Sequence, residues 1–217
     1  MLYLGLAVLF TWPLLLEVGS RLPLGSESSA TLPLFNLWTL SWNADRAAHL
    51  FSGYWDAPIF HPQEAAFGLS DPMPATGLLF AILRLATSNP FLSYNLCLLA
   101  ILALNGAAAA HLAAALGAGR APALLSGLLA VGLPWVSNEL GVIQMTVLFP
   151  VLFAVAALVR FLQSPGYLRA AVLGLWAAAA YLTSNYFGVY LSLFLLLAGA
   201  LLVGRDQLTA ANANRAA

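Results

Sequence analysis

The chain has 217 residues, of which 62% are hydrophobic and only 7% are charged, and its charges balance at a net charge of zero. A water-soluble globular domain carries about 25% charged residues, so this composition excludes a soluble fold. With no lysine, no basic tract and only one cysteine, Cys97, the sequence gives no sign of a nucleic-acid partner, an intrachain disulfide or a cysteine-cluster metal site.

The first predicted element is a transmembrane helix over residues 1–18. This apolar run lacks the basic start and the small-residue cleavage site of a signal peptide. We therefore predict that it is not cleaved and stays in the protein as a membrane-spanning helix. Pro13 is tolerated in a membrane helix when neighbouring groups replace the lost hydrogen bond. Residues 19–89 are predicted to form a long extracytoplasmic loop with amphipathic interfacial helices.

Helical periodicity begins at Pro33, inside this loop. One helical stripe is apolar and consists of Leu37, Leu40, Ala44, Ala47 and Phe51. The stripe beside it is polar and consists of Asn36, Thr39, Asn43 and Arg46. Trp38 and Trp42 are suited to anchoring at a membrane–water interface. The pattern predicts a helix that lies on the membrane surface rather than through it.

Residues 90–205 are predicted to form a transmembrane bundle of about five helices, since about 20 apolar residues cross a bilayer as a helix. The expected spans are 90–116, 121–137, 141–161, 167–183 and 186–203. Residues 73–87 are apolar but short for a span, and we predict that they do not cross. The Ala- and Asn-rich tail, residues 206–217, is predicted to be disordered. The predicted fold class is therefore an all-α polytopic bundle of about six spans.

Arginines set the predicted orientation, because cytoplasmic loops collect them. If residues 73–87 do not cross, five of the eight arginines share one side: Arg120, Arg160, Arg169, Arg205 and Arg215. The loops around Glu139 and Asn185 then share the other side with residues 19–89. This arrangement predicts a multi-pass protein of the bacterial inner membrane with a cytoplasmic N-terminus.

Four stretches carry a resemblance to a known family: Leu37–Trp42, Asp56–Pro62, Ser70–Asp71 and Asn89–Leu96. Together they resemble the N-terminal part of bacterial multi-spanning glycosyltransferases of the GT-C superfamily, of the polyprenyl-phosphate-sugar-dependent type. The resemblance covers residues 1–203, and outside these stretches it is generic membrane helix. It implies a hexosyltransferase that moves a sugar from a lipid-linked donor to an acceptor at the extracytoplasmic face.

The resemblance also implies an acidic residue in the first outer loop, and Glu27 stands at that position. Inverting sugar transfer needs a base that takes the proton from the acceptor hydroxyl, and a positioned carboxylate can do so. Glu27 and Asp71 are the predicted catalytic residues, with Glu27 ahead of Asp71. The alternatives are that Glu27 is a solvated loop residue and that Asp71 caps a helix beginning near Pro72.

Arg84, Asp56 and Glu64 are the predicted substrate-binding residues. A guanidinium matches phosphate geometry, so Arg84 would hold the donor phosphate, unless it snorkels to the interface. No metal ligand is predicted, although Asp45, His49 and His61 could hold a divalent ion. Their spacing is better explained by the solvent-exposed polar face of an interfacial helix and its loop.

The predicted partners are membrane lipid, a polyprenyl-phosphate sugar and other membrane proteins. Four polar residues fall in or near predicted spans, and we expect them to make hydrogen bonds between helices: Asn95, Asn105, His111 and Gln144. The alternative function is a non-catalytic integral membrane subunit, or a truncated GT-C-like scaffold in a larger membrane complex. A small transporter is a third possibility, but the spans hold no paired charges and no inverted repeat to support it.

Overall fold

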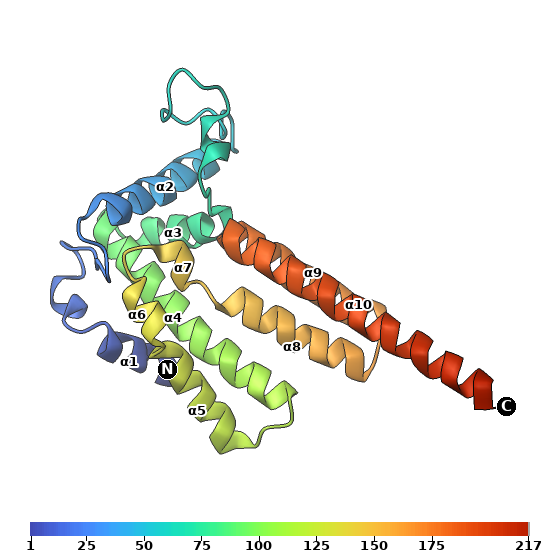
Figure 1. The fold of residues 1–217 in the computed structure, drawn as a ribbon. Coiled ribbons are helices and arrows are strands. Elements are labelled where there is room, and N and C mark those ends of the chain that lie inside the picture. Colours follow the sequence, from blue (N-terminus) through green and yellow to red (C-terminus); the bar gives the residue numbers. More distant parts are fainter. Residues whose placement is uncertain (217) are drawn as a thin grey trace.

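The computed structural model of the chain describes the backbone of residues 1–216 and the side chains of residues 1–202. All regular elements in this part of the chain are helices, which confirms the predicted all-α class. In chain order they are α1 (Leu2–Phe10), η1 (Leu14–Glu17), α2 (Thr31–Ala48), η2 (Ala66–Leu69), α3 (Pro74–Ala86), α4 (Pro90–Ala115), α5 (Arg120–Val131), α6 (Pro134–Asn138), α7 (Ile143–Thr146), α8 (Phe149–Gln163), α9 (Tyr167–Thr183) and α10 (Asn185–Ala216) (Figure 1). The prediction of a disordered tail, residues 206–217, falls on residues whose side chains lie outside the described part.

Four helical segments are long and apolar enough to cross a membrane: Pro90–Ala115, Arg120–Asn138, Ile143–Gln163 and Asn185–Leu202. Two of them join consecutive helices, α5 with α6 and α7 with α8. Helix α9 has the bounds of the fifth predicted span, residues 167–183, but at 17 residues it belongs with the shorter apolar helices. These helices support a membrane protein, while the count of about six spans stays a prediction.

Helix α4 lies at the centre of the bundle and packs against α1, α3, α5 and α8. Its buried side chains, among them Tyr94, Leu98 and Ile101, form much of the main core. At Gly106, a Cβ would lie 2.7 Å from a Val131 methyl carbon and 2.8 Å from the Tyr3 ring. The absence of a side chain at this position therefore lets α1, α4 and α5 approach closely, as small residues do in membrane bundles.

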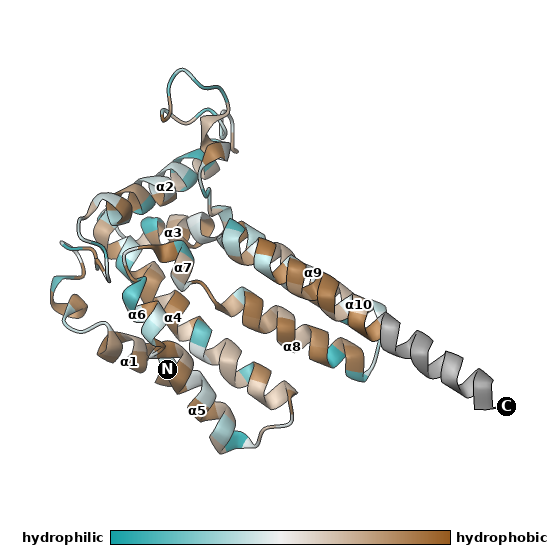
Figure 2. Cartoon of the chain, in the orientation of Figure 1, coloured by the Kyte–Doolittle hydropathy of each residue, from teal (hydrophilic) through white to brown (hydrophobic). Residues whose placement is uncertain are grey.

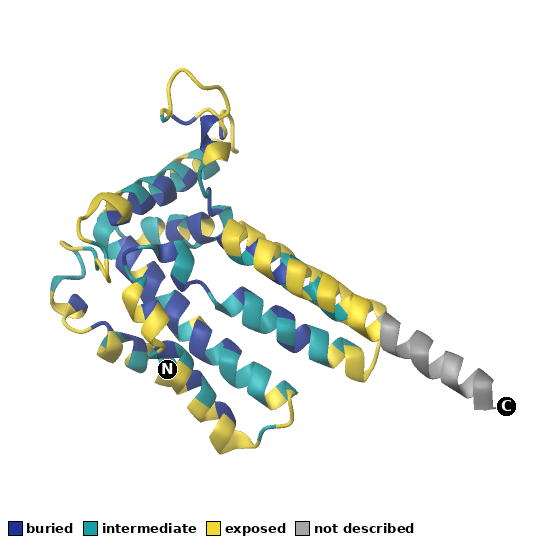
Figure 3. Cartoon of the chain, viewed as in Figure 1, coloured by how far each residue is buried: buried dark blue, intermediate teal, exposed yellow. Residues whose placement is uncertain are grey.

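The outer faces of α9 and α10 are apolar and exposed, as Figures 2 and 3 show. Leu175, Leu196 and Leu197 each expose about two thirds of their surface. A helix that is apolar on its outer face is typical of a membrane span. The exposure pattern agrees with lipid contact along this side of the bundle.

The first predicted span, residues 1–18, is not one continuous helix. Helix α1 ends at Phe10, where the Thr11 hydroxyl donates to the Ala7 carbonyl over 2.8 Å. Pro13 has no amide hydrogen to continue the helix, and the chain resumes as the short helix η1. At about 1.5 Å per residue, the nine residues of α1 extend about 14 Å, less than half the hydrocarbon thickness of a bilayer.

Helices α2 and α3 form most of the ordered structure between residues 19 and 89, and they pack side by side across one end of the bundle (Figure 1). The predicted helix beginning near Pro33 is confirmed as α2, but the predicted exposure of its stripes is wrong. Leu37 and Leu40 are buried in the protein core instead of facing lipid. The polar residues Asn36, Thr39 and Asn43 are buried as well. Hydrogen bonds to backbone carbonyls elsewhere in the protein offset the burial of the two asparagine side chains.

We call the end of the bundle that carries α2 and α3 the insert end. The Ser26 amide donates to the Asn138 carbonyl over 2.7 Å, and the Asn185 amide donates to Asp71 over 3.2 Å, so the loops near Glu139 and Asn185 both lie at this end. At the other end, the arginine end, Gln163 donates to the Ala115 carbonyl. The predicted grouping of the loops is therefore confirmed, while the side that faces the cytoplasm stays a prediction.

Candidate functional site

The predicted site residues do not form one cluster. Glu27 lies beside the connection between α6 and α7, whereas Asp71 lies at the junction of α9 and α10. Arg84 is near the far end of α3, whose 13 residues extend about 20 Å at about 1.5 Å per residue. Asp56 and Glu64 belong to the exposed loop that protrudes beyond α2 in Figure 1.

Asp71 occupies the most enclosed position of the predicted carboxylates. Its Oδ1 accepts a hydrogen bond from the Asn185 amide at 3.2 Å, at the first turn of α10. Its Oδ2 is buried and accepts no hydrogen bond from the described residues. The hydroxyl of Ser184, the residue before Asn185, is also buried and without a partner among them. Two unpartnered polar atoms thus belong to residues at the junction of α9 and α10, at the insert end.

Burial raises the pKa of Asp71 to about 6, and the hydrogen bond from Asn185 lowers it only in part. A carboxyl group with a pKa near 6 is partly protonated close to neutral pH and can exchange a proton there. Helix α3 begins at Pro74, and its first turn receives no side-chain cap. The predicted cap at a helix near Pro72 is therefore wrong, because Asp71 binds the start of α10 instead.

Glu27 is half-buried in a loop that packs on the α6–α7 connection. Its own amide donates to the Leu24 carbonyl over 3.0 Å. A Cβ at Gly141 would lie 2.9 Å from the Glu27 side chain. Glu27 is therefore held against the protein rather than fully solvated, and no contact joins it to Asp71.

The three predicted substrate-binding residues each have a local structural partner or an exposed position. The Arg84 guanidinium donates to the Thr87 carbonyl over 3.0 Å, at the end of its own helix. Asp56 accepts from the Ala65 amide over 3.1 Å and so closes the protruding loop. Glu64 is exposed in the same loop. A role of these residues in substrate binding stays a prediction.

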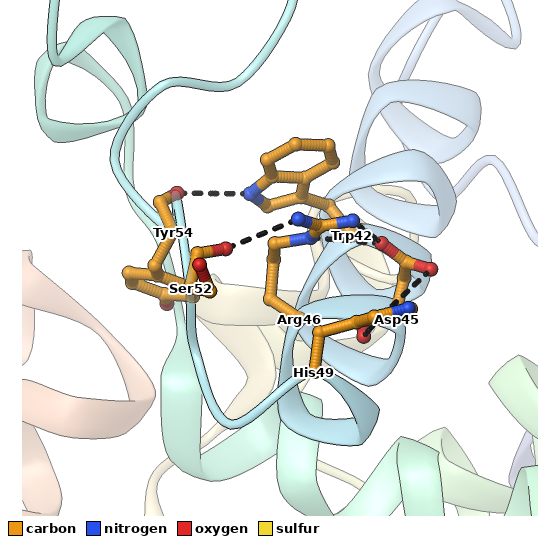
Figure 4. A network of polar contacts seen from close by, with 6 residues as sticks. All are labelled: Trp42, Asp45, Arg46, His49, Ser52 and Tyr54. Atoms are coloured by element: carbon orange, nitrogen blue, oxygen red, sulfur yellow. Dashed lines mark hydrogen bonds and ion pairs between the residues drawn. The ribbon is translucent and has the colours of Figure 1, made fainter.

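Figure 4 shows a polar network at the end of α2. The Arg46 guanidinium pairs with Asp45, donates to the Ser52 carbonyl over 3.1 Å and lies 4.7 Å above the Trp42 ring. His49 Nδ1 lies 2.8 Å from the Asp45 carbonyl and 3.7 Å from its carboxylate. Asp45 and His49 thus already have partners, and no group of three metal-ligating side chains occurs among the described residues.

Asn43 connects this network to α3. It donates to the Pro72 carbonyl over 2.7 Å and accepts from the Tyr54 hydroxyl over 2.7 Å. Burial raises the pKa of Tyr54 to about 12, so its hydroxyl keeps the proton that it donates. Trp42 Nε1 in turn donates to the Tyr54 carbonyl. The contacts fix the base of the protruding loop and the segment that leads to Asp71.

Two of the polar residues predicted in the spans bind backbone rather than other side chains. Asn105 donates to the Thr146 carbonyl over 2.7 Å and accepts from the amides of Leu148 and Phe149 at the start of α8. Asn95 donates to the carbonyls of Val18 and Arg21, each over 2.7 Å. The prediction of hydrogen bonds between helices is confirmed for Asn105, whereas Asn95 binds the non-helical segment that follows η1.

Sequence reasoning missed Ser184 and Asn185 as neighbours of Asp71. A serine and an asparagine between two apolar runs are typical of a helix start, so the beginning of α10 was visible in the sequence. The contact with Asp71, more than a hundred residues earlier, leaves no local pattern. The partnership of Asn43 with Tyr54 and Pro72 is hidden for the same reason.

Comparison of the chain with models of protein families, with curated protein sequences and with solved structures found no match. The resemblance to GT-C glycosyltransferases therefore stays a prediction from the sequence motifs.

Proposed function

We propose that this chain is a membrane glycosyltransferase-like protein that transfers a sugar from a polyprenyl-phosphate donor to an acceptor at the insert end, with Asp71 as the proton acceptor. The observation that carries the proposal is the half-buried Asp71 carboxyl group, whose pKa is raised to about 6 and whose Oδ2 has no partner among the described residues. Buried carboxyl groups with perturbed pKa values are concentrated at functional sites.

The chemistry requires few groups from the protein. The Asp71 carboxylate takes the proton of the acceptor hydroxyl as the hydroxyl oxygen forms a bond to the anomeric carbon. The bond from that carbon to the donor phosphate breaks, and the polyprenyl phosphate leaves with the electron pair. Because a base is most effective when its pKa is near the working pH, the raised pKa of Asp71 is the reason that this proposal gives Asp71 the role of base, in place of the Glu27 that the sequence motifs favoured.

The lipid-linked donor suits the position of Asp71. A polyprenyl chain lies in the membrane beside apolar helices, so its phosphate and sugar reach the level of the helix ends. Asp71 lies at such an end, next to the first turn of α10. The positive dipole of a helix N-terminus favours anionic groups, which suits both the carboxylate and a nearby donor phosphate.

The test uses the purified chain in liposomes with undecaprenyl-phosphate hexoses as donors, and it measures release of undecaprenyl phosphate with and without added glycan acceptors. Loss of a general base typically lowers the rate by about 10² to 10⁴, so we expect Asp71→Asn to abolish most turnover while the protein stays folded. Glu139→Gln is the matched control, because Glu139 is a carboxylate at the same end of the bundle and has no role in the proposed site. Unchanged turnover in Asp71→Asn would remove Asp71 from the site.

The scattered positions of Glu27, Asp71 and Arg84 favour a second candidate, a non-catalytic membrane subunit or scaffold. These residues contact three different parts of the chain, at the α6–α7 connection, the start of α10 and the end of α3. In that case no donor is turned over by the parent protein, and the protein co-purifies with other membrane proteins. The liposome assay separates the two candidates.

A further inference from the structure

A pocket at the arginine end lies between α4, α8 and α9, on the opposite side of the bundle from Asp71. It has a volume of about 200 Å³ and is lined by His111, Phe153, Ala157, Arg160, Leu168, Arg169, Val172 and Trp176. Drug-sized ligands occupy pockets of about 300 to 1,000 Å³. The smaller volume suits a head group and the first part of a chain rather than a whole soluble ligand.

Two arginines supply the charge of this pocket. The Arg169 guanidinium donates to the Ser164 carbonyl in the α8–α9 connection, which orients it and leaves its other donors for a ligand. Arg160 comes from the last turn of α8. The ion pairs found among the described side chains do not include either arginine. The pocket therefore presents two cations and, within the described residues, no carboxylate to balance them.

An aromatic stack forms the rest of the wall. The rings of Phe153 and Trp176 stack at 4.5 Å between centroids, and the His111 ring meets Phe153 edge-on at 5.5 Å. The stack joins one helix to the next, since these residues belong to α8, α9 and α4. Leu168 and Val172 continue the apolar surface and are exposed at its rim. A ligand of this pocket needs an anionic part and an apolar part.

We propose that this pocket binds the phosphate of an anionic membrane glycerophospholipid, with the guanidiniums of Arg160 and Arg169 on the phosphate and the start of an acyl chain along Trp176, Val172 and Leu168. Arginine binds phosphate oxygens bidentately. Basic pockets between transmembrane helices are suited to lipid head groups. A free phosphate ion would leave the apolar wall uncovered, so the lipid is the better occupant.

The position along the helices agrees with this occupant. Arg160 lies three residues before the end of α8, and Arg169 lies in the first turn of α9. The last turns of membrane-spanning helices reach the head-group level of the bilayer. The proposal does not depend on sugar transfer, which would take place at the insert end.

The experiment measures lipid binding to the delipidated chain in detergent micelles, by native mass spectrometry and by thermal stabilisation. The probes are phosphatidylglycerol, phosphatidylcholine with the same acyl chains, and inorganic phosphate. We expect phosphatidylglycerol to bind and to raise the melting temperature, and the Arg160→Gln, Arg169→Gln double variant to bind it at least about ten-fold more weakly. Arg120→Gln is the matched control, an exposed arginine at the same end but outside the pocket lining, and it should keep the parent affinity.

Equal binding of phosphatidylcholine, the same stabilisation by inorganic phosphate alone, or an unchanged affinity in the double variant would each overturn the proposal. If the double variant does not fold, a second measurement decides. Phosphatidylglycerol with brominated acyl chains quenches a nearby tryptophan, so the parent should lose more fluorescence than Trp176→Phe. An identical loss in the two proteins would show that the chain does not lie along Trp176.

Discussion

Replacing Asp71 with asparagine removes one negative charge from the junction of α9 and α10 while keeping the shape of the side chain. Burial raises the pKa of the folded carboxyl group to about 6, whereas an unfolded aspartate has a pKa of about 3.9. The folded protein thus holds the proton more tightly. The contribution of Asp71 to stability is therefore fully present below about pH 4 and is lost as the pH rises through about 6.

The size of this effect follows from the pKa difference. A difference of about two corresponds to about 2.7 kcal/mol, and the remaining solvent contact of Asp71 reduces it to about 1 to 2 kcal/mol. The amide of Asn185 keeps an acceptor, because an asparagine carbonyl oxygen can replace Oδ1. At pH 7.5 we therefore expect Asp71→Asn to be more stable than the parent by about 1 to 2 kcal/mol, and at pH 4 to be equal to it.

The assay heats both proteins in detergent micelles at pH 4, 5, 6 and 7.5 and measures the fraction that remains monodisperse. For a chain of this length the expected gain at pH 7.5 is about 2 to 8 °C in melting temperature. Asp56→Asn serves as the control, since it removes a carboxylate that is exposed rather than enclosed.

The competing effect is the dipole of α10, which stabilises an anion at its N-terminus by about 0.3 to 1 kcal/mol. If that effect exceeded the cost of burial, Asp71→Asn would melt below the parent at pH 7.5. Such a result would refute the burial argument and leave Asp71 as a helix cap. It would also remove the physical support for Asp71 as a base.

Two further predictions concern topology and the buried asparagines. A cysteine placed at the exposed Glu64 and one placed at Gly166, where a side chain meets no atom within 4 Å, should react with a membrane-impermeant maleimide from opposite sides of the membrane. Cys97 is buried and should add little background. Labelling of both positions from one side would contradict the arrangement of the bundle. Asn105→Leu should lower the melting temperature by an amount equivalent to about 1 to 3 kcal/mol for each amide left unpaired. The control, Gln163→Leu, removes an exposed hydrogen bond and should change the melting temperature little. Equal melting temperatures of the two variants would mean that Asn105 does not hold the start of α8.

The helices after residue 90 could be predicted well because their length is the signal. Predicted spans 90–116 and 167–183 correspond to α4, Pro90–Ala115, and α9, Tyr167–Thr183. Long apolar runs form helices in a bilayer regardless of their neighbours, since each backbone group finds its partner within the same segment. The bounds of such helices depend only on local residues, such as the proline that begins α4 and the glycine that precedes α9.

The first segment and α2 show where local reasoning ends. Pro13 is compatible with either a bent span or a helix end. The structure shows a helix end, at which the Thr11 hydroxyl donates to the Ala7 carbonyl. The periodicity of α2 predicted a helix correctly but assigned its apolar stripe to lipid. Whether a stripe faces lipid or protein depends on α3 and α4, and those contacts are not encoded in the stripe itself.

Four buried asparagines and the half-buried Asn89 share one physical role that neither helix propensity nor charge pattern reveals. Each donates to a backbone carbonyl distant in sequence: Asn36 to Gly141, Asn43 to Pro72, Asn89 to Gly19, Asn95 to both Val18 and Arg21, and Asn105 to Thr146. All of these carbonyls belong to breaks or ends of helices. Irregular backbone inside a membrane protein is tolerated only where protein groups satisfy it, and an amide side chain can do so without a charge. These asparagines therefore hold the irregular backbone at the insert end and at the break before α8, and with it the segments that carry Glu27 and Asp71.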